Sequence, residues 1–142
     1  MHFKKLKGLI FLIILSLTLF GSCSANGGDK TTESTTSNAT IYQQISGEEA
    51  KRLMDTEADY VIVDARTEEE FQQGHIEGAI LIPEYEIKER AEAELPDKDQ
   101  LILVYCRSGR RSKIASQALA DLGYTNVKEF GGIIDWQYEI VK

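Results

Sequence analysis

Apolar and polar positions follow one another along the chain in blocks that are typical of a mixed α/β domain. Short apolar runs rich in β-branched or aromatic residues predict buried strands. These runs lie at 60–63, 79–82 and 101–105, and a last short strand is predicted at 127–130. Strands that are apolar throughout, and that are separated by helical segments, indicate a parallel sheet covered by helices on both faces.

The segments between these runs carry helix signals. Ser46–Glu49 and Thr67–Glu70 each have the spacing of a helix capping box, and Gly74 is placed to end the second helix. A polar helix is predicted over 84–94, and a closing helix over 133–138.

One further segment, 112–122, has the pattern of an amphipathic helix and is followed by Gly123. The apolar side of this helix consists of Ile114, Ala115, Ala118, Leu119 and Leu122.

The first 22 residues have the pattern of a secretory signal peptide. Three lysines lie in Met1–Gly8, an apolar run extends from Leu9 to Phe20, and small residues end the segment. Twelve helical residues extend about 18 Å, which is short of a hydrocarbon core of about 30 Å. A cleaved signal peptide is therefore favoured over the alternative, a permanent membrane span.

Leu19–Cys23 resembles the lipobox of bacterial lipoproteins, although Phe20 is bulkier than the residue usual there. The resemblance implies that Cys23 is lipidated and anchors the protein to the outer face of the bacterial cell membrane. Secretion with a free Cys23 is the alternative. Residues 24–40 contain no large apolar side chain, so they predict a flexible tether before a folded domain at 41–142.

The charge balance excludes one class of partner. The chain has a formal charge of −7, and residues 1–22 hold three lysines and no acidic residue. Residues 23–142 therefore carry 13 basic and 23 acidic residues, a formal charge of −10. An acidic protein repels the phosphates of nucleic acid, so we expect no nucleic-acid partner.

Residues 106–113 are the most unusual segment of the predicted domain. They read Cys-Arg-Ser-Gly-Arg-Arg-Ser-Lys, with four cations in eight residues, and they follow the strand 101–105. A loop that leads from a strand into a helix directs backbone N–H groups and the positive helix end inward. We therefore expect Cys106 to be an accessible thiol with a lowered pKa. The alternative is a buried, inert cysteine before a solvated basic turn.

Four motifs resemble the signatures of the rhodanese family and occur in the family's order. They are Val-Ile-Val-Asp-Ala-Arg at 61–66, Gly-His-Ile-Glu-Gly-Ala at 74–79, Cys-Arg-Ser-Gly-Arg-Arg at 106–111, and Gly131-Gly132 with Trp136. The resemblance spans about residues 42–138. It implies a three-layer α/β domain with five parallel strands and helices on both faces. It also implies sulfurtransferase activity through a cysteine persulfide.

The resemblance assigns expected roles to individual residues. Cys106 is the implied catalytic residue and sulfur acceptor, whereas Asp64 and Arg66 are expected to support the site. His75 is expected to be structural, with a catalytic role as the alternative. The implied substrate-binding cradle consists of Arg107, Ser108, Gly109, Arg110 and Arg111.

Loop length distinguishes two chemistries. Cysteine-based phosphatases place an arginine six positions after the cysteine, where this chain has Ser112, whereas Arg111 lies five positions after Cys106. The shorter loop resembles the sulfurtransferase version, which suits a single sulfur atom better than a tetrahedral oxyanion.

We therefore expect Cys106 to accept sulfur from an anion such as thiosulfate, or from a polysulfide, and to pass it to a thiol or cyanide-like acceptor. A carrier domain that holds sulfur or an anion without turnover remains open, as do a phosphatase or arsenate reductase and a lipoprotein with a relic fold. Two histidines, one of them within residues 1–22, do not make a metal ligand set. We expect no metal and no cofactor, and we expect a monomer.

Overall fold

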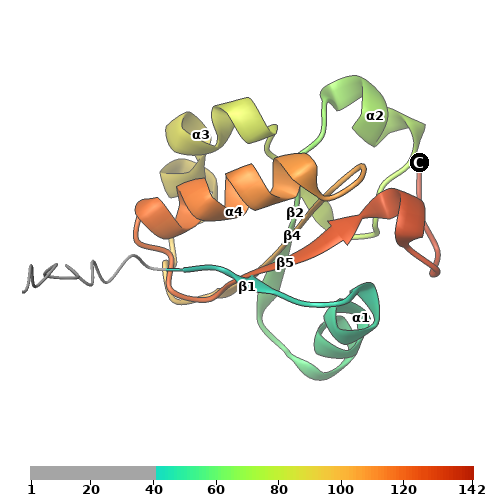
Figure 1. Cartoon of the computed structure of the whole chain (residues 1–142), viewed down its shortest axis with the longest axis horizontal. Coiled ribbons are helices and arrows are strands. Elements are labelled where there is room, and N and C mark those ends of the chain that lie inside the picture. The colour runs from blue at the N-terminus through green and yellow to red at the C-terminus, as the bar shows by residue number, and fades with distance from the viewer. Residues whose placement is uncertain (1–40) are drawn as a thin grey trace, which may run out of the picture. The chain divides into compact units, whose positions relative to one another are not determined.

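A computed structural model describes residues 41–142, and the signal peptide, lipidation and tether predicted within 1–40 lie outside these residues. Helices and strands alternate along the described part (Figure 1). The strands are β1 (Gln43–Gln44), β2 (Tyr60–Asp64), β3 (Ala79–Leu81), β4 (Leu101–Cys106) and β5 (Val127–Gly132). The α-helices are α1 (Gly47–Thr56), α2 (Glu68–Gln73), α3 (Ile87–Glu94) and α4 (Arg110–Asp121). Short 3-10 turns are formed by Glu84–Glu86 and Ile133–Asp135.

The five strands form one parallel sheet in the order β1-β5-β4-β2-β3. Helices α3 and α4 cover one face of the sheet and α1 lies on the other (Figure 1). The expected α/β fold with five parallel strands and helices on both faces is therefore confirmed. In this topology the carboxyl ends of β2, β3, β4 and β5 meet at one edge of the sheet, where α/β proteins place their ligands.

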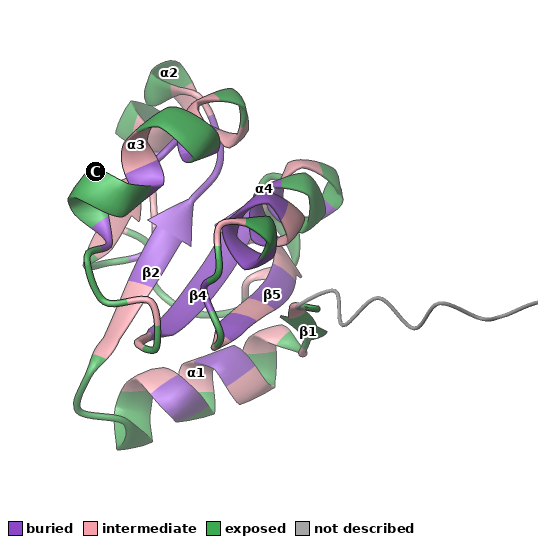
Figure 2. Ribbon diagram, turned by 90° about the vertical axis from the view of Figure 1, so that its left-hand side faces the viewer, coloured by how far each residue is buried: buried purple, intermediate pink, exposed green. Residues whose placement is uncertain are grey.

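Alternation of side chains along β4 separates the core into two clusters. Ile102, Val104 and Cys106 point toward α3 and α4, and Leu103 and Tyr105 point toward α1. All six residues of β4 are buried, and Figure 2 shows the central strands as the most buried part of the fold. Cys106 is therefore the last residue of a fully buried strand.

Three helix predictions need correction. The helix predicted over 84–94 starts as a 3-10 turn and becomes α-helical only at Ile87. The closing helix predicted over 133–138 is a single 3-10 turn that ends at Asp135. The helix predicted from Ser112 begins at Arg110, because Gly109 turns the chain directly from β4 into α4.

The apolar side of α4 was also predicted incorrectly in part. Ile114 is 44% exposed, whereas Ser112 and Ser116 are fully buried against the sheet. Small side chains let a helix approach a sheet closely, so the buried face of α4 is set by residue size as well as by hydropathy. Among the described residues, no helix is both long and apolar enough to cross a membrane.

The end of β5 departs from regular pairing with β4. Val104 pairs with Glu129 and Cys106 pairs with Gly132, so β5 has one more residue than β4 over this interval. The extra residue is accommodated by Gly131, whose φ is +90°. This bulge places Gly132 directly beside the end of β4.

Candidate active site

Cys106 is the last residue of β4 and lies at the carboxyl edge of the sheet. The backbone N–H of Gly109 donates a hydrogen bond to its Sγ at 3.1 Å. The residue is only 1% exposed, so the expectation of an accessible thiol is wrong for the resting structure. Cys106 belongs to the core cluster on the α3 and α4 side of the sheet, and the Gly109 N–H brings a polar donor to its sulfur.

The loop reaches this shape because Gly109 adopts a left-handed conformation, with φ +93°, as the N-cap of α4. No side chain caps the helix at this position. The first backbone N–H groups of an α-helix lack partners within the helix, and they carry the positive end of its dipole. These groups and the loop N–H groups are therefore available to a negatively charged sulfur.

Gly132 supports the loop from behind. A Cβ atom at this position would lie 2.3 Å from the carbonyl oxygen of Arg107 and 2.6 Å from the Cα of Ser108. Only a residue without a side chain allows β5 and the 106–109 loop to approach so closely. The glycine pair seen in the sequence is thus part of the loop's packing.

The environment of the thiol lowers the pKa of Cys106 from its ordinary value of 9.0. Burial raises the pKa, but hydrogen bonds from the Ser112 hydroxyl and from the backbone N–H groups of Ser112, Ser108 and Gly109 lower it by more. The expected direction is confirmed, and backbone donors contribute as expected. The contribution of the Ser112 hydroxyl was not predicted.

The arginines of the loop differ in their surroundings. Arg107 and Arg110 are exposed. Arg111 is half-buried and donates two hydrogen bonds to Glu70 of α2, at 2.7 and 2.8 Å. Arg111 lowers the pKa of Glu70 to about 2. The predicted cradle therefore contains two solvated guanidinium groups and one that is held in an ion pair.

Asp64 is the last residue of β2, Arg66 follows two positions later, and the two form a buried ion pair. Arg66 donates to both carboxylate oxygens of Asp64, at 2.7–3.0 Å, and it also donates to the carbonyl oxygen of Gly74 at 2.7 Å. Tyr105 accepts a hydrogen bond from the N–H of Ile76 beside this pair. These contacts connect the end of β2 to the 74–78 turn and do not involve Sγ of Cys106.

His75 belongs to the same turn but faces α2. Its ring stacks on Phe71 at a centroid distance of 3.7 Å, and its Nδ1 lies 3.1 Å from the carbonyl oxygen of Phe71. Its backbone pairs with Val141. All of these contacts are structural in kind.

The sequence model of the rhodanese-like domain matches residues 46–139, which is about two thirds of the chain. The chain belongs to the rhodanese family. Its four motifs therefore lie within a domain that is shared with known sulfur-transferring proteins.

Several relatives are named as sulfurtransferases. The chain is 45% identical over 73 residues to thiosulfate sulfurtransferase PspE of Escherichia coli, covering 51% of this chain and 70% of that protein. It is 34% identical over 111 residues to the putative sulfur carrier protein YrkF of Bacillus subtilis, covering 78% of this chain but only 57% of that protein. A solved structure of rhodanese with anions from E. coli is 42% identical, with a TM-score of 0.56, and covers 58% of this chain and 98% of that one. The protein is thus a rhodanese-type sulfurtransferase.

Two acidic residues of this rhodanese domain that contact the loop were not singled out from the sequence. Glu70 pairs with Arg111, as described above, and Glu129 is 2% exposed and accepts a hydrogen bond from the Ser112 hydroxyl at 2.7 Å. The signal for Glu129 was an acidic residue within a predicted strand of a covered sheet. The signal for Glu70 was weaker, because a capping box already accounted for it.

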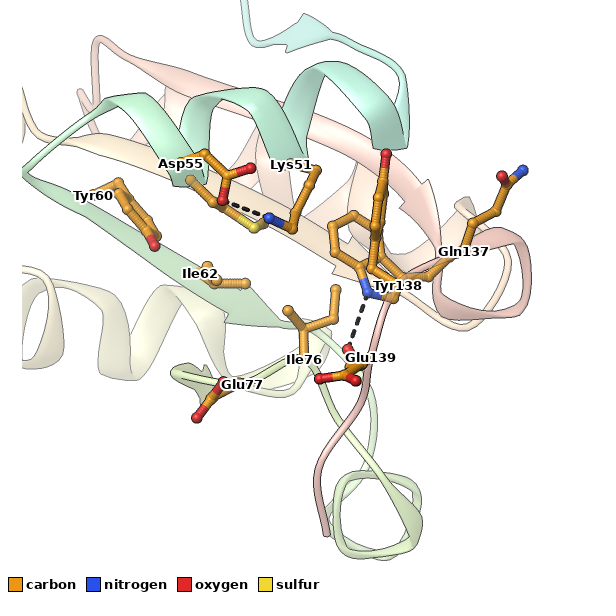
Figure 3. Close-up of a pocket in the computed structure, with 11 residues that line it drawn as sticks. Lys51, Asp55, Tyr60, Ile62, Ile76, Glu77, Gln137, Tyr138 and Glu139 are labelled. Atoms are coloured by element: carbon orange, nitrogen blue, oxygen red, sulfur yellow. Dashed lines mark hydrogen bonds and ion pairs between the residues drawn. The ribbon is translucent and has the colours of Figure 1, made fainter.

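The rhodanese domain also has a pocket of about 820 Å³ that is separate from the loop (Figure 3). It lies beside α1, over Ile62 of β2, and is bordered by Ile76 and by Trp136–Glu139. No residue of the 106–111 loop lines it. Within residues 41–142, no cluster of His, Cys, Asp or Glu side chains is suited to hold a metal ion.

Proposed function

We propose that Cys106 is the catalytic residue of this sulfurtransferase and carries the transferred sulfur as a persulfide. The observation that supports this best is the hydrogen bond from the Gly109 N–H to Sγ, at the start of α4. A sulfur in this position is surrounded by donors that stabilise negative charge, whether it lies on a thiolate or on a persulfide. A thiolate that is already formed needs no general base, which is consistent with the structural contacts of His75.

The first half-reaction uses an anionic donor such as thiosulfate. The Cys106 thiolate attacks the outer sulfur of the donor, a sulfur–sulfur bond forms at Sγ, and sulfite leaves with the electron pair of the broken bond. Arg107 and Arg110 are exposed, so they can bind the donor and the departing sulfite. The N–H groups of Ser108 and Gly109 contribute donors to the persulfide.

The second half-reaction returns the enzyme to its starting state. A thiophilic acceptor, such as a thiolate or cyanide, attacks the outer sulfur of the persulfide, and the Cys106 thiolate leaves. The two half-reactions share one covalent intermediate, so the kinetics should be ping-pong. Asp64 and Arg66 take no part in bond making and fix the neighbouring turn.

Intact-mass spectrometry of the full-length protein tests this proposal. Incubation with thiosulfate should add the mass of one sulfur atom, and cyanide should then remove it with release of thiocyanate. Cys106→Ser should gain no sulfur, whereas the matched Cys23→Ser control should behave as the parent protein. Absence of the adduct from the parent protein would contradict the proposal.

The same experiment distinguishes an enzyme from a carrier. The relative named as a putative sulfur carrier makes this second function worth testing. A carrier would gain the sulfur but retain it when cyanide or a thiol is added. Rapid, repeated release of thiocyanate would establish turnover.

Donor selectivity tests the role assigned to the arginines. Arg107→Ala should weaken the use of thiosulfate more than the use of a neutral polysulfide, because the lost contact is one of charge. Arg52→Ala is a matched control, because Arg52 lies on α1 and pairs with Glu49. An equal loss for both donors would show that Arg107 shapes the loop instead.

We also propose that residues 1–22 are a cleaved signal peptide, and that Cys23 is lipidated and holds the domain at the outer face of the membrane. The support is the basic start, apolar run and small residues of this segment. Metabolic labelling with a fatty-acid analogue should label the parent protein but not Cys23→Ser. A labelled Cys23→Ser variant, or an unlabelled parent in the membrane fraction, would contradict this proposal.

A further inference from the structure

The pocket beside α1 has no part in the proposed sulfur chemistry (Figure 3). Its volume of about 820 Å³ lies within the range of about 300–1,000 Å³ that is usual for small-molecule sites. No residue of the sulfur-binding loop, 106–111, lines it. The pocket therefore suits a small organic ligand that is distinct from the sulfur donor and acceptor.

The floor of the pocket is apolar. Ile62 of β2 and Ile76 of the 74–78 turn lie between α1 and the C-terminal segment, and Met54 of α1 lines the same pocket (Figure 3). Ile62 and Ile76 belong to the buried core cluster on the α1 side of the sheet, so their positions are fixed by packing. Contact with this floor favours the carbon body of a ligand over water.

Aromatic side chains stand at the two ends of the pocket, with Tyr60 at one end and Tyr138 at the other (Figure 3). Trp136 lines the pocket beside Tyr138, with a ring centroid distance of 4.9 Å and an edge-on contact. On its other side the Trp136 ring packs against Phe130, at a centroid distance of 5.6 Å. This aromatic wall is thus formed before any ligand binds, which lowers the entropic cost of binding.

The C-terminal segment that carries this wall is held in place by its backbone. The Trp136 indole N–H donates to the carbonyl oxygen of Glu139 at 3.4 Å. Val141 and His75 exchange two backbone hydrogen bonds, at 2.8 and 2.9 Å. These contacts keep residues 136–139 beside the 74–78 turn, so the pocket is a built feature of the fold.

The charged residues that line the pocket are one lysine and three acids. Lys51 is paired with Asp55 on α1. Glu77 and Glu139 lie at the side opposite α1, are exposed, and form no ion pair within residues 41–142 (Figure 3). The rim of the pocket therefore has an excess of negative charge that no ion pair compensates.

Lys51 shows that the aromatic wall accepts a positive charge. Its ammonium nitrogen lies 5.6 Å from the centroid of the Tyr138 ring, which is within the range of a cation–π contact of about 6 Å. Aromatic faces attract cations in the same way as carboxylates do, and aromatic surroundings are typical of sites for organic ammonium groups. An anion would find only Lys51, whose charge Asp55 already balances.

We propose that this pocket binds a small organic cation, an ammonium compound with an apolar or aromatic body. The carbon body lies over Ile62 and Ile76, and the positive charge lies at the rim beside Glu77 and Glu139. The proposal goes beyond sulfur transfer and does not depend on the role of Cys106. Its test therefore gives the same result whether or not the protein loads sulfur.

Binding of benzyltrimethylammonium to the full-length protein tests the proposal. Phenylmethanesulfonate is the comparison ligand, because it has the same benzyl body and the opposite charge. Trp136 is the single tryptophan of the chain, so its fluorescence reports on the pocket directly, and titration calorimetry gives a second measurement. The cation should bind saturably and about tenfold more tightly than the anion. Equal or tighter binding of the anion, or no binding of the cation, would overturn the proposal.

A double variant, Glu77→Gln with Glu139→Gln, tests the charge at the rim. It should raise Kd for the cation about fivefold, because each exposed charge contributes only modestly. The matched control is Glu69→Gln with Glu89→Gln, which removes the same charge from exposed positions on α2 and α3 outside the pocket and should leave Kd unchanged. An equal rise in both double variants would mean that the net charge of the protein attracts the probe, and the proposal would be wrong.

Analytical ultracentrifugation separates a ligand from a second copy of this chain as the occupant of the pocket. Tyr138→Ala should weaken binding of the cation, because it removes part of the aromatic wall, and should leave the sedimentation coefficient unchanged. A parent protein that is dimeric and does not bind the cation, and whose dimer dissociates in Tyr138→Ala, would show that a second copy covers the pocket. That result would overturn the proposal.

Discussion

Both oxygens of the Glu70 carboxylate accept hydrogen bonds from the guanidinium group of Arg111, at 2.7 and 2.8 Å. Glu70 also completes the capping box of α2 by accepting from the N–H of Thr67. The start of α2 is thereby fixed to the first turn of α4, immediately beside the sulfur-binding loop. The pair also neutralises one of the three arginines that the sequence assigns to the substrate.

Glu70→Gln should strengthen the binding of anionic donors. The amide cannot hold Arg111 with two charge-assisted bonds, so the guanidinium group becomes available to thiosulfate. We expect KM for thiosulfate to fall about threefold, in keeping with the modest energy of a partly exposed ion pair, and KM for a neutral polysulfide to stay the same. Steady-state kinetics with both donors measure this, and Glu92→Gln is the control for a change in net charge. An unchanged KM for thiosulfate would mean that Arg111 does not contact the donor.

Glu70 should also make the free energy of unfolding depend on pH. Its pKa in the folded protein is about 2, below the ordinary value of 4.5, because of the bond to Arg111. A carboxyl group whose pKa is lower in the folded than in the unfolded protein stabilises the fold at any pH above the unfolded-state pKa. This contribution is lost as pH falls from about 4.5 toward 2. The parent protein should therefore exceed Glu70→Gln in unfolding free energy at neutral pH, and the difference should shrink at about pH 3. Urea unfolding of both proteins at the two pH values checks this, and a pH-independent difference would contradict it.

Gly132→Ala should disable the loop without unfolding the domain. The added methyl group would lie 2.3 Å from the carbonyl oxygen of Arg107, which must move and carry the Gly109 N–H away from Sγ. We expect sulfur loading to be lost while the circular dichroism spectrum of the folded protein is retained. Gly47→Ala is the control, because a Cβ there meets Trp136 at an ordinary 3.6 Å. Full sulfur loading by Gly132→Ala would show that the loop tolerates this displacement.

Asp64→Asn should lower the free energy of unfolding but leave the pKa of the Cys106 thiol nearly unchanged. Asp64 is fully buried and Arg66 is 5% exposed, so removal of the carboxylate leaves a buried guanidinium group without its counter-charge. Breaking a buried pair in this way costs about 3–5 kcal/mol. Urea unfolding should show this loss, and the remaining folded protein should keep the lowered pKa of Cys106. Arg52→Ala, which breaks an exposed pair with Glu49, should change stability little.

The sequence predicted β2, β3 and β4 well because each contains a continuous apolar run. It did not predict β1, since Gln43 and Gln44 are polar, exposed and paired only at the edge with β5. Backbone pairing at an edge leaves no hydropathy signal. The early start of α4 was missed for a related reason, because it depends on the left-handed conformation of Gly109 rather than on an apolar pattern.

The sequence predicted the chemical character of the site, but it did not predict which side chains form ion pairs there. Local order along the chain indicated that Cys106 would lie among N–H donors, and the direction of its pKa shift follows from that. The pair between Arg111 and Glu70 joins residues 41 positions apart, and no local pattern encodes it. The burial of Cys106 was also missed, because it depends on tertiary packing around the end of β4 rather than on a local pattern.

The low pKa and the burial of Cys106 together predict an unusual pattern of reactivity. A small reagent such as iodoacetamide should react with a rate that rises with pH and levels off at lower pH in the folded protein than in the same protein in urea, because loop hydrogen bonds favour the thiolate only when the loop is folded. A bulky maleimide should react slowly with the folded protein, since the residue is 1% exposed, and quickly in urea. Alkylation rates measured in a Cys23→Ser background, followed by intact mass, check both points. If the folded and unfolded proteins levelled off at the same pH, the N–H groups around Sγ would not be stabilising its charge.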